Sequence, residues 1–289
     1  MEKLEMQKLV KVPETVFSEF CREIDLPEEM RTLTETCNRT WEYKFDAELS
    51  RDFFDEEKWD IAMTGVQEIL GEDPDGVKIL TLELQCAVRA HAYYQNMGIS
   101  EEIYRETYKC FSRFVREHKV SYGRYGFDRH GWAKRQIAMK IFRIGELEYQ
   151  LPVPGEEPEI GLHIPSDAKL TRENIRDSVQ LARAFLKHFY EPYAQLPMSC
   201  CTWLLSEPLS KILPEGSHIL QFQELFCVKK MYPKELAFME WLYQNRDYTL
   251  EDVDRLPERT SLQRLVKKHL KDGGVIGEGY GILQEDRLM

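Results

Sequence analysis

The stretch WAKRQIAMKIFRIGELEYQLPVPGEEPEIGLHIPSD, residues 132–167, is where the periodicity of the chain changes. Before it, apolar residues recur at the three- and four-residue spacing that is typical of amphipathic helices. After it, short apolar runs typical of strands alternate with helical segments. The sequence therefore predicts an α+β protein, with an all-helical N-terminal domain over residues 1–138 and a mixed α/β domain over residues 139–289.

The composition of the chain excludes several classes of protein. Fifty acidic residues against 39 basic residues give a formal net charge of -11, whereas a general nucleic-acid binder needs a basic surface that neutralises phosphates. The opening MEKLEMQKLV has no long apolar core, and no run reaches the roughly 18 apolar residues that a membrane span requires. We therefore expect no nucleic-acid partner, no membrane contact and no signal peptide.

The cysteines favour a reducing compartment. There are seven, an odd number, and no CxxC pair occurs among positions 21, 37, 86, 110, 200, 201 and 227. Such scattered cysteines are typical of free thiols in the cytoplasm, because disulfide frameworks and zinc sites need paired cysteines at characteristic spacings. We expect a cytoplasmic protein without a disulfide framework and without a metal.

The first half of the chain reads as helices that end at glycine or proline. Trp59, Met63, Val66 and Leu70, for example, are spaced by four, three and four residues, as on one helical face. A serine at position 100 is a typical N-cap after the break at Gly98. Helices are expected over residues 14–24, 28–38, 57–71, 76–96, 100–118 and 128–139.

The second half mixes both kinds of element. The clearest amphipathic helix covers residues 171–190, with Thr171 as its expected N-cap. Shorter helices are expected over residues 206–213, 233–244 and 260–271. Strands are expected over residues 141–150, 159–164, 198–205 and 218–228, and in the closing VIGEGYGILQ.

Four runs in the second half carry a family resemblance: RQIAMKIFRIGELEY, GLHIPSDAKL, CCTWLL and SHILQF. They resemble a family of bacterial acyltransferase-domain proteins, in which a helical N-terminal domain precedes a domain similar to the GCN5-related N-acetyltransferases (GNAT). The resemblance implies a GNAT-like fold and the transfer of an acyl group from acyl-coenzyme A to an amine on a small molecule or peptide. The order of strands and helices after residue 159 agrees with the second half of such a domain.

The resemblance also implies where acyl-coenzyme A would bind. In the GNAT fold the pantetheine arm inserts between two parallel strands that splay apart, here residues 159–164 and 198–205. The pyrophosphate contacts backbone amides at the start of the following helix, where the helix dipole favours an anion. The cofactor contacts implied are the backbone amides of residues 168–172 together with Ile164, Ser166, Ala168, Lys169, Arg172, Cys201 and Trp203.

The turn that would hold the pyrophosphate departs from the usual pattern. GNAT enzymes usually carry a Gly-x-Gly or Gly-x-Ala run here, because glycine lets backbone amides approach phosphate closely. This chain has PSDAKLTREN instead, in which acidic and basic side chains nearly balance. Two hypotheses therefore stand: an acyl-coenzyme A-dependent transferase, and a non-catalytic ligand- or protein-binding module on a degraded acetyltransferase scaffold.

Two residues are candidate catalytic bases. His163 ends a strand whose apolar residues point to the other face, and its near-neutral pKa suits a general base. Glu224 shares one face of the expected strand 218–228 with Leu220, Phe222, Phe226 and Val228. This apolar face would desolvate its carboxylate and raise its pKa. The simpler interpretations are a half-exposed histidine at a strand end, and a bulge or salt bridge that turns Glu224 outward.

The pair Cys200 and Cys201 allows one further hypothesis. Neighbouring strand residues face opposite ways, so the two thiols are not expected to act together. One of them could serve as a nucleophile if a histidine activates it. The more common role of such residues is a small buried hydrophobe.

Overall fold

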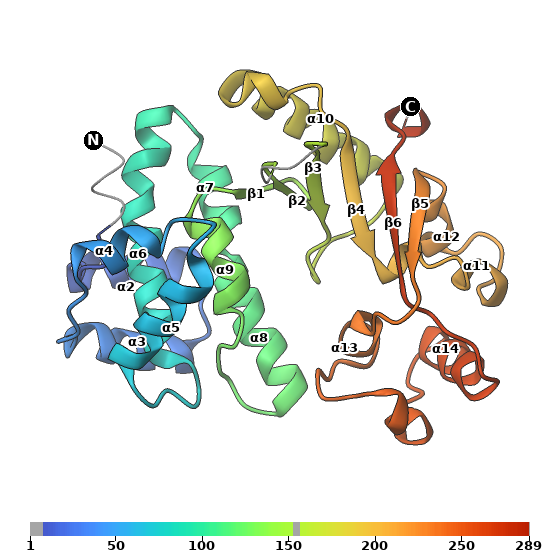
Figure 1. Cartoon of the computed structure of the whole chain (residues 1–289), viewed down its shortest axis with the longest axis horizontal. Helices are drawn as coiled ribbons and strands as arrows, with labels where there is room; N and C mark the ends of the chain where they lie inside the picture. The colour runs from blue at the N-terminus through green and yellow to red at the C-terminus, as the bar shows by residue number, and fades with distance from the viewer. Residues whose placement is uncertain (1–7, 153–156, 289) are drawn as a thin grey trace. The chain divides into compact units, whose positions relative to one another are not determined.

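The computed structural model describes residues 8–152 and 157–288 (Figure 1). It divides into two compact units, Met1–Phe142 and Arg143–Met289. The first unit is helical and the second contains a mixed sheet with helices, so the predicted fold class is confirmed. Within the described ranges, no helix is long and apolar enough to cross a membrane.

Residues 8–142, the described part of the first unit, contain eight helices. Two of them, α7 and α8, replace the single helix expected over residues 100–118, because the chain kinks at Lys109. Helix α4 was not expected; the side chain of Asp46 caps it by accepting the N–H of Leu49 at 2.7 Å. The bounds are α2 (Glu14–Glu23), α3 (Glu28–Arg39), α4 (Ala47–Asp52), α5 (Trp59–Leu70), α6 (Val77–Met97), α7 (Glu101–Tyr108), α8 (Cys110–Tyr122) and α9 (His130–Ile137).

Helix α6 forms the centre of this unit. It packs against α2, α3 and α9, and its buried positions occur on most of its circumference, as expected for a helix inside a bundle. Glu83 on this helix is fully buried, and burial raises the pKa of its carboxyl group well above the ordinary value. Burial therefore favours the neutral, protonated form of this carboxyl group.

The second unit is built on a six-stranded sheet in the order β1-β2-β3-β4-β6-β5. Helix α10 (Arg172–Phe189) connects the parallel strands β3 and β4, and its Ser178 accepts or donates a 2.9 Å hydrogen bond with Tyr149 on β2. The strands are β1 (Ile141–Ile144), β2 (Leu147–Gln150), β3 (Ile160–His163), β4 (Met198–Thr202), β5 (Phe226–Tyr232) and β6 (Glu278–Leu283).

Apart from α10 and the short 3-10 helix η1 (Glu191–Tyr193), the helices of this unit follow β4 in the chain, the last being η4 (Glu285–Leu288). Three of them, α11, α13 and α14, supply a second hydrophobic core that includes Trp203, Phe238 and Val266. The elements are η2 (Trp203–Leu205), α11 (Leu209–Ile212), α12 (His218–Gln223), α13 (Ala237–Tyr243), η3 (Leu250–Arg255) and α14 (Ser261–Lys271).

Three of the expected strands differ in the structure. Residues 141–150 form two strands, because Gly145 takes a φ of +62° and allows a two-residue connection. The strand expected over residues 198–205 ends at Thr202 and continues as the 3-10 turn η2. The strand expected over residues 218–228 is wrong, since its first half is helix α12, which Ser217 caps.

The glycines of the closing GEGYG run make room for η2. A Cβ atom on Gly279 would lie 2.3 Å from the carbonyl oxygen of Leu205. A side chain at this position of β6 would therefore push η2 away from the sheet. These glycines serve close packing between backbone segments.

Candidate functional site

Strand β4 pairs unequally with its two neighbours. Toward β6 it keeps register over four residue pairs, from Ser199↔Ile282 to Thr202↔Gly279. Toward β3 only two pairs form, Ile160↔Met198 and Gly161↔Ser199. Both strands continue beyond these pairs, so β3 and β4 part after their first two residues. The parallel pairing and the parting of these strands agree with the GNAT-like arrangement expected from the sequence.

The turn after β3 already uses three of the amides expected to bind phosphate, among them that of Thr171, which donates to the carbonyl of Lys169 at 2.9 Å. The N–H of Lys169 donates to Oε2 of Glu146 at 2.8 Å, and the N–H of Ala168 donates to the carbonyl of Pro165 at 3.0 Å. A carboxylate thus sits where the resemblance places an anion. The side chain of Lys169 is exposed.

Helix α10 starts directly after this turn. The side chain of Thr171 accepts the N–H of Asn174 at 3.2 Å, which confirms Thr171 as the N-cap. The amides of Arg172 and Glu173 are the first two of the helix and precede this capped position. They lie at the N-terminus, which is the positive end of the helix dipole. The guanidinium of Arg172 donates to the carbonyl of Arg287.

Ion pairs hold the turn in place. Arg143 on β1 is buried; its Nη1 lies 3.0 Å from Asp167 and its Nη2 lies 3.7 Å from Glu146. The two acidic side chains near the turn are therefore partly neutralised by a cation from the neighbouring hairpin. This reduces the repulsion that the Asp167 carboxylate would exert on a phosphate.

The other expected cofactor contacts divide into two groups. Ile164 is half-buried and Ser166 is exposed, and both follow the end of β3 in the chain. Cys201 is exposed on β4. Trp203 is buried in the second core with Phe238 and Val266, so its ring is directed into that core.

One face of the sheet carries polar side chains beside the point where β3 and β4 part. Directly paired residues point to the same face, and Cys201 pairs with Tyr280 while Gly161 pairs with Ser199. His163, two residues after Gly161, therefore shares this face with Cys201. Its Nε2 lies 2.9 Å from Oε1 of Gln150. We call this surface the polar face.

A carboxyl and a phenol extend the polar face along β6. Oε2 of Glu278 accepts a hydrogen bond from Sγ of Cys201 at 3.7 Å. The hydroxyl of Tyr280 donates to Oε2 of Glu159 at 2.5 Å. Partial burial, opposed by the Cys201 hydrogen bond and reinforced by the Glu235 carboxylate, raises the pKa of Glu278 above its ordinary value.

The two adjacent cysteines face opposite ways, as expected. Cys200 is fully buried, and burial raises the pKa of its thiol far above the ordinary value. Burial and the neighbouring Glu278 carboxylate raise the pKa of the Cys201 thiol to about 11. Both cysteines are therefore thiols at neutral pH, which is unfavourable for a nucleophile.

Glu224 does not lie where the sequence analysis expected it. It is the C-cap of α12, and its side chain is exposed rather than desolvated on an apolar strand face. Strands β4 and β6 separate β3, which carries His163, from β5, which follows Glu224. The structure does not bring His163 and Glu224 together as a catalytic pair.

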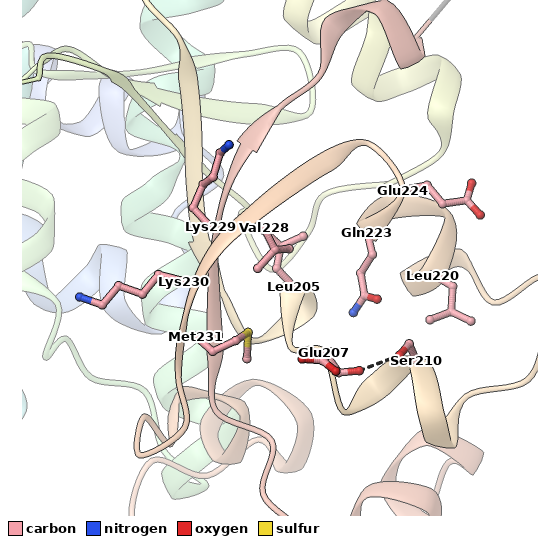
Figure 2. A pocket seen from close by; sticks show the side chains of 10 residues that line it. All are labelled: Leu205, Glu207, Ser210, Leu220, Gln223, Glu224, Val228, Lys229, Lys230 and Met231. Atoms are coloured by element: carbon pink, nitrogen blue, oxygen red, sulfur yellow. Dashed lines mark hydrogen bonds between the residues drawn. The ribbon is translucent and has the colours of Figure 1, made fainter.

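Glu224 lies instead at a pocket beside the outer strand β5 (Figure 2). This pocket has a volume of about 590 Å³. Lys230 points to the other side of β5 from Leu205 and Gln223, as Figure 2 shows. The pocket is lined by Leu205, Glu207, Ser210, Leu220, Gln223, Glu224, Val228, Lys229, Lys230 and Met231.

The sequence analysis missed Glu278, Tyr280 and Glu159. The signal was present, because Glu278 and Tyr280 alternate with glycines in the closing strand and therefore share one face. The pairing of β6 with β4 was not expected, and only that pairing places the two residues beside Cys201. Among the described residues, no group of three or more His, Cys, Asp or Glu side chains could hold a metal ion.

Comparisons with known proteins agree with this architecture. Residues 17–139 match the family of the N-acyltransferase N-terminal domain, and residues 141–283 match the family of the GNAT-like C-terminal domain. A search of curated proteins found no match.

Solved structures share the fold over nearly the whole chain. The crystal structure of an acyltransferase in complex with decanoyl-CoA and teicoplanin is 20% identical, with a TM-score of 0.76, and the alignment covers 97% of this chain and 93% of that one. An acyltransferase in complex with CoA and 10C-teicoplanin is also 20% identical, with a TM-score of 0.74 and coverage of 92% and 86%. At this identity the likeness concerns the fold.

Proposed function

Because the chain belongs to the proteins that join an N-acyltransferase N-terminal domain to a GNAT-like C-terminal domain, we propose that it transfers an acyl group from acyl-coenzyme A to an amine. The observation that carries this proposal is the parting of β3 and β4 after two residue pairs. Unpaired strand edges offer amide and carbonyl groups to an extended ligand such as a pantetheine arm.

The start of α10 supplies the anion site in this proposal. The amides of Arg172 and Glu173, the positive end of the helix dipole and the exposed Lys169 ammonium all favour a pyrophosphate. The Glu146 carboxylate has to leave the Lys169 amide, or the phosphate has to bind one residue further along the turn. Glycine is not needed for an anion that contacts only the first turn of the helix.

His163 is the proposed general base beside the thioester. It ends β3 at the parting of the strands, and its hydrogen bond to Gln150 fixes the orientation of the imidazole. A neutral imidazole would accept a proton from an attacking amine.

Medium-chain acyl-coenzyme A is the proposed donor, and an amine on a small molecule or peptide is the proposed acceptor. Related folds have been crystallised with decanoyl-CoA, with octanoyl-CoA and with the glycopeptide teicoplanin. A cytoplasmic location, expected from the free thiols, is part of the same proposal.

Calorimetric titration tests this function. Decanoyl-CoA and coenzyme A should both bind the wild-type protein, and decanoyl-CoA should be consumed when a panel of primary amines is added. The absence of heat and of a thermal shift at millimolar coenzyme A would overturn the proposal. Binding without transfer to any amine would instead favour the non-catalytic binding module.

A further inference from the structure

Gln150 is the last residue of β2, and its side chain contacts the proposed base His163. In the antiparallel pair of β2 and β3, Gln150 is the register partner of Gly161, and Glu148 is the register partner of His163. Directly paired residues point to the same face of a sheet, so Gln150 reaches His163 diagonally across the two strands on the polar face. Its Oε1 lies 2.9 Å from Nε2 of His163, and both residues are half-buried.

Gly161 leaves the space in which this contact forms. A Cβ atom at this position would lie 3.3 Å from Cβ of Gln150 and 3.4 Å from Nε2 of His163. Both distances are shorter than the separation of about 3.5–4.0 Å at which non-bonded carbon atoms attract best. A larger side chain at this position of β3 would therefore compete with the amide for the imidazole.

The atom that faces the imidazole decides which ring nitrogen carries the proton. An amide oxygen only accepts hydrogen bonds, and in a neutral imidazole one nitrogen donates while the other accepts. Nε2 of His163 therefore carries the proton in the contact with Oε1 of Gln150, and the lone pair lies on Nδ1. The contact of Gln67 with His130 differs, because there the amide nitrogen of Gln67 lies 3.4 Å from the ring nitrogen Nε2.

We infer that Gln150 is a positioning residue that holds His163 as the Nε2–H tautomer, so that Nδ1 is the atom that takes the proton from the attacking amine. The inference rests on the proposed function and names the reacting atom of its general base. Gln150 acts through the imidazole and not on the substrate.

The step balances in protons and electron pairs. The lone pair of a neutral primary amine forms the C–N bond with the thioester carbonyl carbon, and one N–H proton passes to Nδ1 of His163. The C–S bond breaks, and its electron pair leaves with sulfur. The imidazolium returns the Nδ1 proton to the coenzyme A thiolate, while the Nε2 proton stays in the hydrogen bond to Gln150. The products are an amide, coenzyme A thiol and the neutral imidazole.

The ionisable groups on the same face as His163 come from both neighbouring strands and from its own. Glu148 is its register partner on β2 and is buried. Cys201 lies on β4, and its thiol, with a pKa of about 11, is neutral at neutral pH. Glu159 precedes β3 and accepts a hydrogen bond from Tyr280. A change made only at position 150 leaves all of these groups in place.

The first test removes the acceptor and measures turnover with the full chain. Gln150→Leu removes the amide oxygen but keeps the size of the side chain, and Gln180→Leu makes the same change at an exposed position on α10. With decanoyl-CoA and a primary amine that the wild type accepts, Gln150→Leu should lower kcat about 10- to 100-fold, because the wrong tautomer cannot serve as the base. The KM for decanoyl-CoA should stay the same, and Gln180→Leu should match the wild type.

Gln150→Glu separates the hydrogen bond from packing. A carboxylate also accepts the Nε2 proton, so kcat on the plateau of the pH profile should return to within about threefold of the wild type. The added negative charge favours the imidazolium, so the neutral base is lost at a higher pH as the solution is acidified. The acidic limb of the pH–rate profile should therefore move to higher pH by about one unit. A structural role alone would give neither the rescue nor the shift.

Nuclear magnetic resonance gives a readout that needs no turnover. Long-range proton–nitrogen spectra of protein with isotope-labelled histidine distinguish protonated from unprotonated ring nitrogens among the seven histidines. The His163→Ala variant identifies the signals of His163. With the ring neutral, the wild type and Gln150→Glu should show a protonated Nε2 and an unprotonated Nδ1. Gln150→Leu should show a mixture of tautomers or the opposite one.

The outcomes separate the two proposals. A wild-type protein in which Nδ1 of His163 carries the proton would overturn the role of Gln150 and leave the acyltransferase function intact, and this spectrum decides even if Gln150→Leu fails to fold. Wild-type kcat in a folded Gln150→Leu would overturn that role as well. A wild-type protein that neither binds decanoyl-CoA nor acylates amines would overturn the proposed function instead, whichever tautomer the spectra show.

Discussion

The two sides of strand β4 differ in a way that matters for function. Toward β6, four consecutive residue pairs hold the strands in register, and Gly279 allows η2 to pack against them. Toward β3, pairing ends after Gly161↔Ser199. Pro165 follows soon after, and a proline has no N–H to continue a ladder. One side of β4 is thus a closed sheet, and the other offers unpaired backbone groups.

This difference determines which groups each side of β4 offers to a ligand. A closed ladder satisfies its own backbone groups, so ligand binding beside it depends on side chains. Where the strands part, backbone and side-chain groups are available together. His163 lies at that position on β3, and Cys201 lies opposite on β4.

The largest effect is expected from replacing His163, on the open side of β4. His163→Ala should lower kcat for amine acylation about 100- to 10,000-fold, because a general base is lost, while the affinity for decanoyl-CoA stays the same. Steady-state kinetics and calorimetry measure the two quantities. His188→Ala, an exposed position on α10, is the matched control. A His163→Ala variant with wild-type kcat would show that His163 is not the general base.

The next effect concerns the anion site on the open side. The double variant Lys169→Glu, Arg172→Glu should weaken coenzyme A binding about 10- to 100-fold, since charge-assisted contacts to phosphate contribute about 1.5–3 kcal/mol. Calorimetry measures the affinity, and thermal unfolding checks the contact of Arg172 with Arg287.

A charge-matched double variant, Lys187→Glu, Lys211→Glu, makes the same net change at exposed positions away from the turn. It should bind coenzyme A as the wild type does. Equal loss of affinity in both double variants would mean that only the overall charge matters, and would remove the turn as the phosphate site.

The sequence predicted the open side better than the closed one. Helix α10, its cap Thr171 and the parallel strands on either side of it follow from local patterns, because a crossover helix joins parallel strands. The pairing of β4 with β6 joins segments almost 80 residues apart, and no local pattern reports such a contact. Glu278 and Tyr280 were missed for that reason.

For Glu224 the error lay in a local pattern, which predicted a strand where the structure has a helix. HILQFQELFCV has period-two spacing at Leu220, Phe222 and Phe226, but the first half of this run also satisfies a helix capped by Ser217. Short apolar runs fit both the helical and the strand period, and residues 218–223 form a helix in the folded protein. The change of element moved Glu224 from a strand face to an exposed cap.

A smaller effect, of opposite sign, concerns Glu146. Glu146→Gln removes the negative charge of the side chain that accepts a hydrogen bond from the Lys169 amide. It should tighten coenzyme A binding by up to about tenfold, because the phosphate no longer competes with a carboxylate for that donor. Calorimetry measures this change. Glu173→Gln, at an exposed position in the first turn of α10, should have a smaller effect. Weaker binding in Glu146→Gln would show that this carboxylate positions the turn for the ligand.

The smallest effect compares two helix caps, one beside the open side of β4 and one remote from it. Thr171 caps α10 and Thr260 caps α14, each through its side-chain oxygen. Replacing either threonine with alanine should lower the free energy of unfolding by about 1 kcal/mol, the usual contribution of such a cap. Denaturant unfolding of the two variants measures this change.

Only the first of these caps should also affect the ligand. Thr171→Ala loosens the first turn of α10, which supplies the amides of Arg172 and Glu173, so coenzyme A should bind a few-fold more weakly. Thr260→Ala should leave that affinity unchanged, because α14 packs in the second core with Trp203. Equal affinities in the two variants would mean that the helix start does not contact the phosphate, and the anion site would then rest on the side chains alone.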